Sequence, residues 1–174
     1  LVYSICSIVL PLLLGVVIGN LLQGLPLDND FEYTGGALFT FLTPYALLVG
    51  LMTVLLMAVH GGLYLLLKTH GSLHERIARR INKAYVGFLV LFVAVAVYSL
   101  LTPHLAANTA QSPALIVIAV LLLVSILSIA IFIKKGDYKK AFVGTILTIV
   151  FFMLIVALQL HPVFLRNTEI IEIG

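Results

Sequence analysis

The sequence has no tryptophan, one cysteine and few charged residues. Charged residues make up 10% of the chain and hydrophobic residues 62%, whereas soluble domains contain about 25% and about 45–50% respectively. A water-soluble fold of 174 residues could not bury this much apolar surface, so lipid is the expected solvent. The lone Cys6 excludes an internal disulfide framework and a C-x-x-C metal motif.

Long apolar segments predict an all-α fold, a polytopic integral membrane helix bundle. A segment of about 20 apolar residues crosses the hydrocarbon core as a helix, because lipid cannot satisfy free backbone groups. The predicted transmembrane helices are residues 2–22, 44–67, 84–101, 113–133 and 141–160. The third is expected to extend upstream, since Ser72 and Glu75 form a capping-box pattern that predicts a helix start. The whole chain, residues 1–174, is predicted to be a single membrane domain.

The distribution of cations predicts the orientation of these helices. Nine of the ten Lys and Arg residues lie in segments 68–83 and 134–140, which fall on one side of a five-helix serpentine. The positive-inside rule places that side, together with Leu1, in the cytoplasm. The segments predicted to be external are 23–43, 102–112 and 161–174. Topology thus accounts for the basic balance, and no nucleic-acid partner is predicted. The apolar start at Leu1, without a charged n-region, is interpreted as the start of an internal fragment of a longer membrane protein.

Small and polar residues inside the predicted helices indicate how they pack. Gly15 and Gly19 form a G-x-x-x-G pair, which predicts close approach of another helix, and Pro11 predicts a bend. Ser125 and Ser128 are expected to donate hydrogen bonds to carbonyl groups of the preceding turn.

A polar face is predicted on the second helix. Thr53, His60 and Tyr64 are separated by seven and four residues, so they share one side. An ionisable residue inside a membrane helix is a functional candidate, and His60 is interpreted either as a packing residue or as a haem ligand, a proton relay or a polar helix contact. Gly61 and Gly62 beside it predict a crowded helix contact, which favours packing.

Acidic residues and histidines give no convincing metal site. Asp28, Asp30 and Glu32 lie close together, but their spacing does not fit an EF-hand loop, and an external polar loop is predicted instead. His70 and His74 have the spacing of a helical metal pair, but the predicted helix start lies between them. No catalytic, cofactor-binding or metal-ligating residue is therefore assigned.

Two stretches carry a resemblance to a known family. "GVVIGNLLQGLPLDNDFEYTGG" and "LTPYALLVGLMTVLLMAVHGGLYLLLKTHGSLHER" resemble subunit II of the cytochrome bd-type quinol oxidases. The shared pattern is a helix ending G-N-x-x-x-G-x-P, an external loop ending Y-T-G, and a P-[YF]-[AG]-L-L-x-G helix. In this sequence the signature loop contains Asp28, Asp30, Tyr33 and Gly35. The last three predicted helices match only in hydropathy and spacing.

The resemblance implies a role beside a larger, haem-bearing subunit I in a bacterial cytoplasmic membrane. Such a complex oxidises quinol, reduces oxygen to water and contributes to a proton gradient. The resemblance implies that haems b and d lie in the partner, that this chain is a structural subunit binding none of them, and that a structural quinone or lipid is a further candidate ligand. The D-G-F-D and W-D-G-N motifs of the family do not occur here, so no catalytic residue is carried over.

Two other functions are weighed against this one. A secondary transporter or permease should have ionisable residues near the bilayer midplane, where His60 alone comes close. A membrane scaffold without redox chemistry is the third hypothesis.

Overall fold

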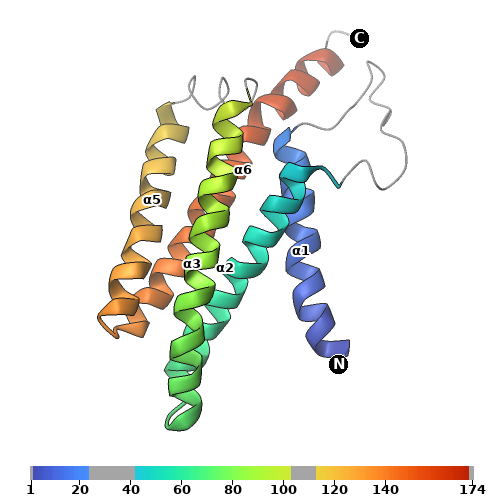
Figure 1. Ribbon diagram of the computed structural model, residues 1–174. Helices are drawn as coiled ribbons and strands as arrows, with labels where there is room; N and C mark the ends of the chain where they lie inside the picture. Colours follow the sequence, from blue (N-terminus) through green and yellow to red (C-terminus); the bar gives the residue numbers. More distant parts are fainter. Residues whose placement is uncertain (1, 24–41, 103–112, 173–174) are drawn as a thin grey trace. The chain divides into compact units, whose positions relative to one another are not determined.

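The computed structural model describes the backbone of residues 2–23, 42–102 and 113–172, and the side chains of residues 5–23, 42–102 and 113–159. Within these ranges the chain is helical except at caps and short turns, which confirms the all-α prediction (Figure 1). It divides into two compact units, Leu1–Leu101 and Thr102–Gly174. Each unit is described separately, and the single membrane domain stays a prediction.

In its described residues the first unit consists of helices α1 (Val2–Gln23), α2 (Pro44–Lys68) and α3 (Ser72–Leu101). Helix α2 packs against both α1 and α3 (Figure 1). It begins with Pro44, whose fixed φ suits a first helical residue, and the Thr43 hydroxyl accepts a hydrogen bond from the Ala46 amide (3.1 Å). Gly71, at φ +70°, reverses the chain between α2 and α3, a conformation that favours glycine.

The second unit is a helical hairpin in its described residues, made of α5 (Pro113–Lys134) and α6 (Tyr138–Glu172). Gly136, at φ +73°, closes the end of α5. The amides of Gly136 and Asp137 donate to the carbonyls of Ile133 (3.1 Å) and Phe132 (3.0 Å), the pattern of a Schellman motif. Asp137 then caps α6, because its carboxylate accepts from the Lys140 amide (3.3 Å).

Five helices in the described residues are long and apolar enough to cross a membrane, as predicted. Helix α3 begins at Ser72 and continues through the predicted third segment, which confirms its upstream extension. The predicted membrane segment 141–160 agrees with the apolar stretch Tyr138–Gln159, and the α6 backbone stays helical beyond it to Glu172. Hydropathy marks where the apolar segment stops, near Gln159, and not where helical hydrogen bonding stops.

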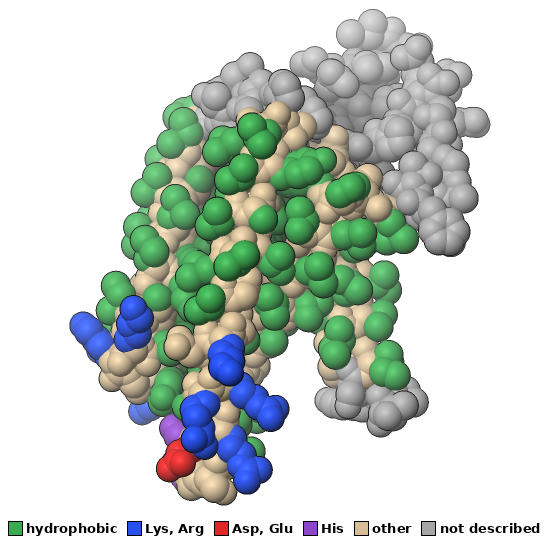
Figure 2. Space-filling model, viewed as in Figure 1, with side chains coloured by type: hydrophobic (Ala, Val, Ile, Leu, Met, Phe, Trp, Pro, Cys, Tyr) green, Lys and Arg blue, Asp and Glu red, His purple; other side chains and the backbone are tan. Residues whose placement is uncertain are grey.

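The helices present aliphatic side chains outward. Hydrophobic side chains cover most of the coloured surface in Figure 2, and Leu10, Leu100 and Val90 are 69%, 72% and 63% exposed. In water such a surface would aggregate, whereas in a bilayer it contacts acyl chains. The protein is accordingly a multi-pass membrane protein, with α2 as the most enclosed helix of the first unit.

Candidate functional site

The predicted polar face of α2 changes from buried to exposed along the helix. Thr53 is 4% exposed, His60 is half-buried and Tyr64 is 49% exposed. At a rise of about 1.5 Å per residue, Thr53 and His60 are separated by about 10 Å along the axis. The three side chains therefore share a side of α2 without converging on one point.

Thr53 lies at a close contact between α1 and α2. Its hydroxyl donates to the Val49 carbonyl of the preceding turn (2.8 Å). A Cβ added at Gly15 would lie 2.6 Å from Thr53 Oγ1 and 2.7 Å from Gly50 Cα. One added at Gly19 would lie 2.7 Å from Ala46 Cα. The G-x-x-x-G prediction is confirmed, because only glycine leaves room for the α2 backbone at both positions.

His60 lies on α2 next to Gly62, which faces α3, and next to Gly61, which faces no described residue. It has an interaction partner of its own in the chain. A Cβ added at Gly62 would meet Ile81 of α3 at 3.2 Å, so Gly62 lies in a helix contact as predicted. For Gly61 that prediction is wrong, since no described atom lies within 4 Å of an added Cβ. Adjacent residues on a helix point about 100° apart, so both could not face α3.

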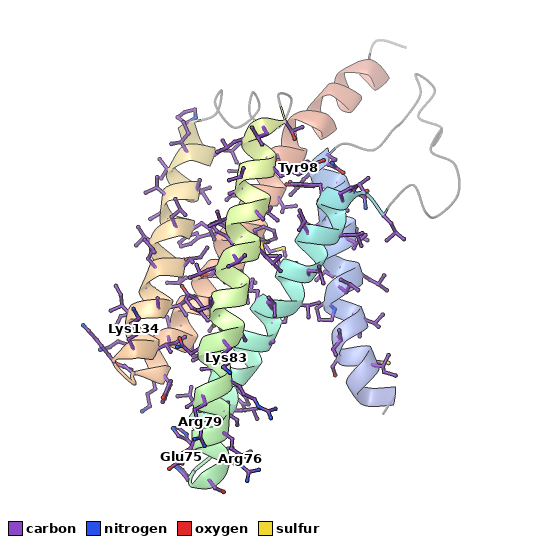
Figure 3. All side chains as sticks on the ribbon, in the orientation of Figure 1. Glu75, Arg76, Arg79, Lys83, Tyr98 and Lys134 are labelled. Atoms are coloured by element: carbon purple, nitrogen blue, oxygen red, sulfur yellow. The ribbon has the colours of Figure 1, made fainter. Side chains whose placement is uncertain are left out.

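A polar group near the other end of the first unit was missed from the sequence. The Tyr45 hydroxyl lies 3.0 Å from Ser99 Oγ, which donates to the Val95 carbonyl (2.9 Å). Ser99 has one proton to give, so Tyr45 is the donor between them. The Tyr45 ring packs on Tyr98, with ring centroids 5.2 Å apart. These contacts join the start of α2 to the end of α3, where Figure 3 labels Tyr98.

Two further polar contacts lie at this end. Thr43 Oγ1 donates to Gln23 Oε1 (2.6 Å), which ties the start of α2 to the end of α1. The buried Asn20 amide donates to the Val16 carbonyl (2.8 Å). The end of α1 and the start of α2 are joined by a connection, so these two helix ends must lie at the same depth in the membrane. Polar residues at both ends were therefore the sequence signal for this contact.

The hairpin of the second unit contains a buried interhelical hydrogen bond. Ser125 and Ser128 donate to the carbonyls of Leu122 (2.9 Å) and Ser125 (2.7 Å), which confirms the prediction for both. Ser125 Oγ also lies 2.9 Å from Thr148 Oγ1 on α6, and Thr148 Oγ1 lies 2.9 Å from the Gly144 carbonyl oxygen. Each hydroxyl has one proton, so whichever of the two donates across the helices gives up the bond to its own carbonyl. Thr148 is 1% exposed and was not singled out from the sequence. A Cβ at Gly144 would meet Ile129 at 2.9 Å, so the helices are also close there.

The remaining predicted residues do not form a described site. Asp28, Asp30, Tyr33 and Gly35 lie outside the described residues. His74 Nδ1 lies 3.2 Å from the Thr69 carbonyl oxygen, beside the turn between α2 and α3. Within the described ranges no three His, Cys, Asp or Glu side chains are grouped as metal ligands.

Comparison with known proteins gives one consistent family. A family model described as cytochrome bd terminal oxidase subunit II matches residues 1–173. Cytochrome bd-I ubiquinol oxidase subunit 2 of Escherichia coli K12 is 38% identical over 96 residues, covering 53% of this chain and 25% of that protein. Cytochrome bd ubiquinol oxidase subunit 2 of Bacillus subtilis is 31% identical over 130 residues, covering 74% and 37%. The chain thus spans about a quarter to two-fifths of these relatives.

Proposed function

The chain belongs to the cytochrome bd terminal oxidase subunit II family, and we propose that it forms part of the accessory, structural subunit of a respiratory quinol:oxygen oxidoreductase. Its partner is the larger subunit I, which carries haems b and d. The complex oxidises quinol, reduces oxygen to water and contributes to a proton gradient in a bacterial cytoplasmic membrane. This chain supplies helix packing and no catalytic group.

The observation that carries the structural role is the use of polar side chains for packing. Every buried side-chain nitrogen and oxygen in the described residues has a hydrogen-bond partner. Thr53 bonds to a carbonyl of its own helix, and the hydroxyls of Ser125 and Thr148 bond to each other or to carbonyls of their own helices, in each case at a close contact with a neighbouring helix. A proton relay or substrate site would instead need polar atoms directed at a ligand.

The surroundings of His60 do not fit those of a haem ligand. A haem needs an axial His, Met, Cys or Tyr facing a space as large as the macrocycle. Among the described residues, His60 is the one histidine that lies well inside a membrane-spanning helix. The next two residues on α2 are Gly61, where an added Cβ would meet no described atom within 4 Å, and Gly62, which packs on Ile81. No second in-span His stands opposite it in the described residues. We therefore assign His60 to helix packing and Tyr64 to the outer surface of α2.

The proposed orientation follows from the charged ends of the helices. The end of α2 and the first turns of α3 carry five cations, and the adjoining ends of α5 and α6 with their turn carry four. Both turns lie at the cytoplasmic side under the positive-inside rule. The loop 23–43, with its family signature, then faces outward, as does the contact between Tyr45 and Ser99.

Purification of the complete complex from its native membrane tests this function. A tag on the full-length subunit should co-purify a larger haem protein, and reduced-minus-oxidised absorbance spectra should contain b- and d-type haem bands. Quinol-dependent oxygen consumption should accompany them. A haem-free preparation without a larger partner would contradict the oxidase role. Loss of one haem from an assembled His60→Gln complex would contradict only the assignment of His60.

A further inference from the structure

Helix α3 carries four cations on one side. Arg76, Arg79, Arg80 and Lys83 recur at three- and four-residue spacing, and all four side chains are exposed. We call them the cationic face. Figure 2 shows a group of Lys and Arg side chains at this end, and Figure 3 labels Arg76, Arg79 and Lys83 there. The buried side of the same helix carries Ile81, Tyr85 and Phe88, so the cations point away from the core of the first unit.

An aliphatic stripe continues the cationic face toward the other end of α3. Val86, Val90, Val93 and Val97 are 52%, 63%, 56% and 49% exposed, again at three- and four-residue spacing. Lys83 and Val93 are separated by about 15 Å along the helix, which is about half the hydrocarbon thickness of a bilayer. The surface therefore changes from cationic to aliphatic within one turn and stays aliphatic for the depth of one leaflet.

Within the described chain the cationic face keeps a net positive charge, because Glu75, one turn before Arg79, sets one carboxylate against four cations and leaves a charge of +3. The ion pair between described residues joins Lys140 to Asp137 in the other unit. Like charges three and four residues apart destabilise a helix unless an anion lies between them. Orientation of the helices requires only a number of cations in the loop, whichever way they point. Burial of Ile81, Tyr85 and Phe88 on the opposite side of α3 directs the cations outward, where lipid headgroups can reach them.

We propose that the cationic face and the valine stripe together bind an anionic phospholipid of the leaflet at that end of α3. The guanidinium groups bind the headgroup phosphate, for which their planar donors are suited, and the acyl chains lie along the valines. A soluble anion or a nucleic acid would use the cations and leave the stripe without a role. The proposal uses the membrane-spanning fold alone and does not rest on the oxidase function.

Photocrosslinking tests the site in the intact complex. The complex is reconstituted into nanodiscs of equal phosphatidylglycerol and phosphatidylcholine, one of which carries a diazirine in its acyl chain, and labelled peptides are identified by mass spectrometry. Phosphatidylglycerol should label residues 86–97 in preference to phosphatidylcholine. Replacing all four residues of the cationic face by Gln should lower that preference by more than tenfold, because each cation near the surface contributes about 1 kcal/mol. The matched control replaces the same number of charges in the other unit, at Lys134, Lys135, Lys139 and Lys140, and should leave the preference intact.

Several results would overturn the proposal. Equal labelling by the two lipids would remove the headgroup selectivity. An equal loss in the α3 and control variants would mean diffuse attraction to surface charge. Displacement of the lipid by millimolar inorganic phosphate or by an oligonucleotide would reassign the face to soluble anions. The charge-preserving variant Arg79→Lys/Arg80→Lys should keep more of the preference than the Gln variant, because the charges remain and only the paired guanidinium donors are lost, which separates loss of charge from misfolding.

Discussion

Adding one methyl group at Gly15 should loosen α1 from α2, whereas the same change at Gly61 should not. Both substitutions, Gly15→Ala and Gly61→Ala, gain the same helix propensity, about 1 kcal/mol. At Gly15 the new Cβ lies 2.7 Å from Gly50 Cα, and at Gly61 it meets no described atom within 4 Å. The difference in stability between the two variants therefore contains no contribution from helix propensity and reports the cost of the close contact at Gly15.

The structure sets the expected size of the effect. The backbones must separate by about 0.7 Å for the Cβ to move from 2.7 Å to the 3.4 Å of an ordinary contact. A gap of about 0.5–1 Å forfeits about a quarter to a half of the dispersion energy of the atoms facing it. Overpacking of this kind costs about 1–3 kcal/mol. Gly15→Ala should accordingly raise the unfolding equilibrium constant roughly 5- to 150-fold relative to Gly61→Ala.

Energy transfer between α1 and α2 measures this difference. One fluorophore is attached to the native Cys6, which is exposed, and the other to Leu65→Cys on α2, an exposed position. Separation is followed as sodium dodecyl sulfate is added to mixed micelles. Equal midpoints for the two alanine variants would refute the reasoning. Thr53→Ala should rescue Gly15→Ala only partly, because it removes the hydroxyl and leaves the Gly50 backbone in place.

Three further outcomes are expected. His60→Gln should leave assembly and oxidase turnover of the complex near wild type, and a large loss in a fully assembled complex would refute the packing role. Ser125→Ala and Thr148→Val should show a coupling free energy of about 0.6 kcal/mol in a double-mutant cycle, and strict additivity would mean that their hydrogen bond contributes nothing. Hydrogen bonds from Lys140 lower the pKa of Asp137 below 3.8. The carboxylate therefore stabilises the start of α6 above that pH and loses this effect as pH falls through its native pKa, which carbon-13 titration of the carboxyl group should place below 3.8.

The fold was largely predictable because a backbone surrounded by lipid must make its hydrogen bonds within the segment, and an apolar segment of this length does so as a helix. Apolar length gave all five helices, and the capping-box pattern gave the start of α3 at Ser72 and with it the full length of that helix. The end of α6 was not predictable from hydropathy, since a helix can continue after its side chains become polar. The signature loop, which contributes to the resemblance to the family, lies outside the described residues.

Helix partners were predictable only in part. The spacing of Gly15 and Gly19 predicted a close contact without identifying Ala46 and Gly50 as its other half. That pair has the same four-residue spacing of small residues on α2, so the signal was present. The Tyr45–Ser99 contact requires the register of α2 on α3, which the turn at residues 69–71 fixes. His60 could not be assigned from its type, because burial depends on where neighbouring helices diverge.

The lengths of the connections set an order of assembly. Helices α2 and α3, and likewise α5 and α6, are joined by three residues each, whereas α1 and α2 are separated by residues 24–43. Closing a short loop loses less chain entropy and is faster, so both hairpins can pair as they enter the bilayer. The closest glycine contact, between α1 and α2, thus belongs to the pair with the longest connection. Until it forms, acyl chains must fill the space beside Gly15 and Gly19, and docking of α1 must expel them.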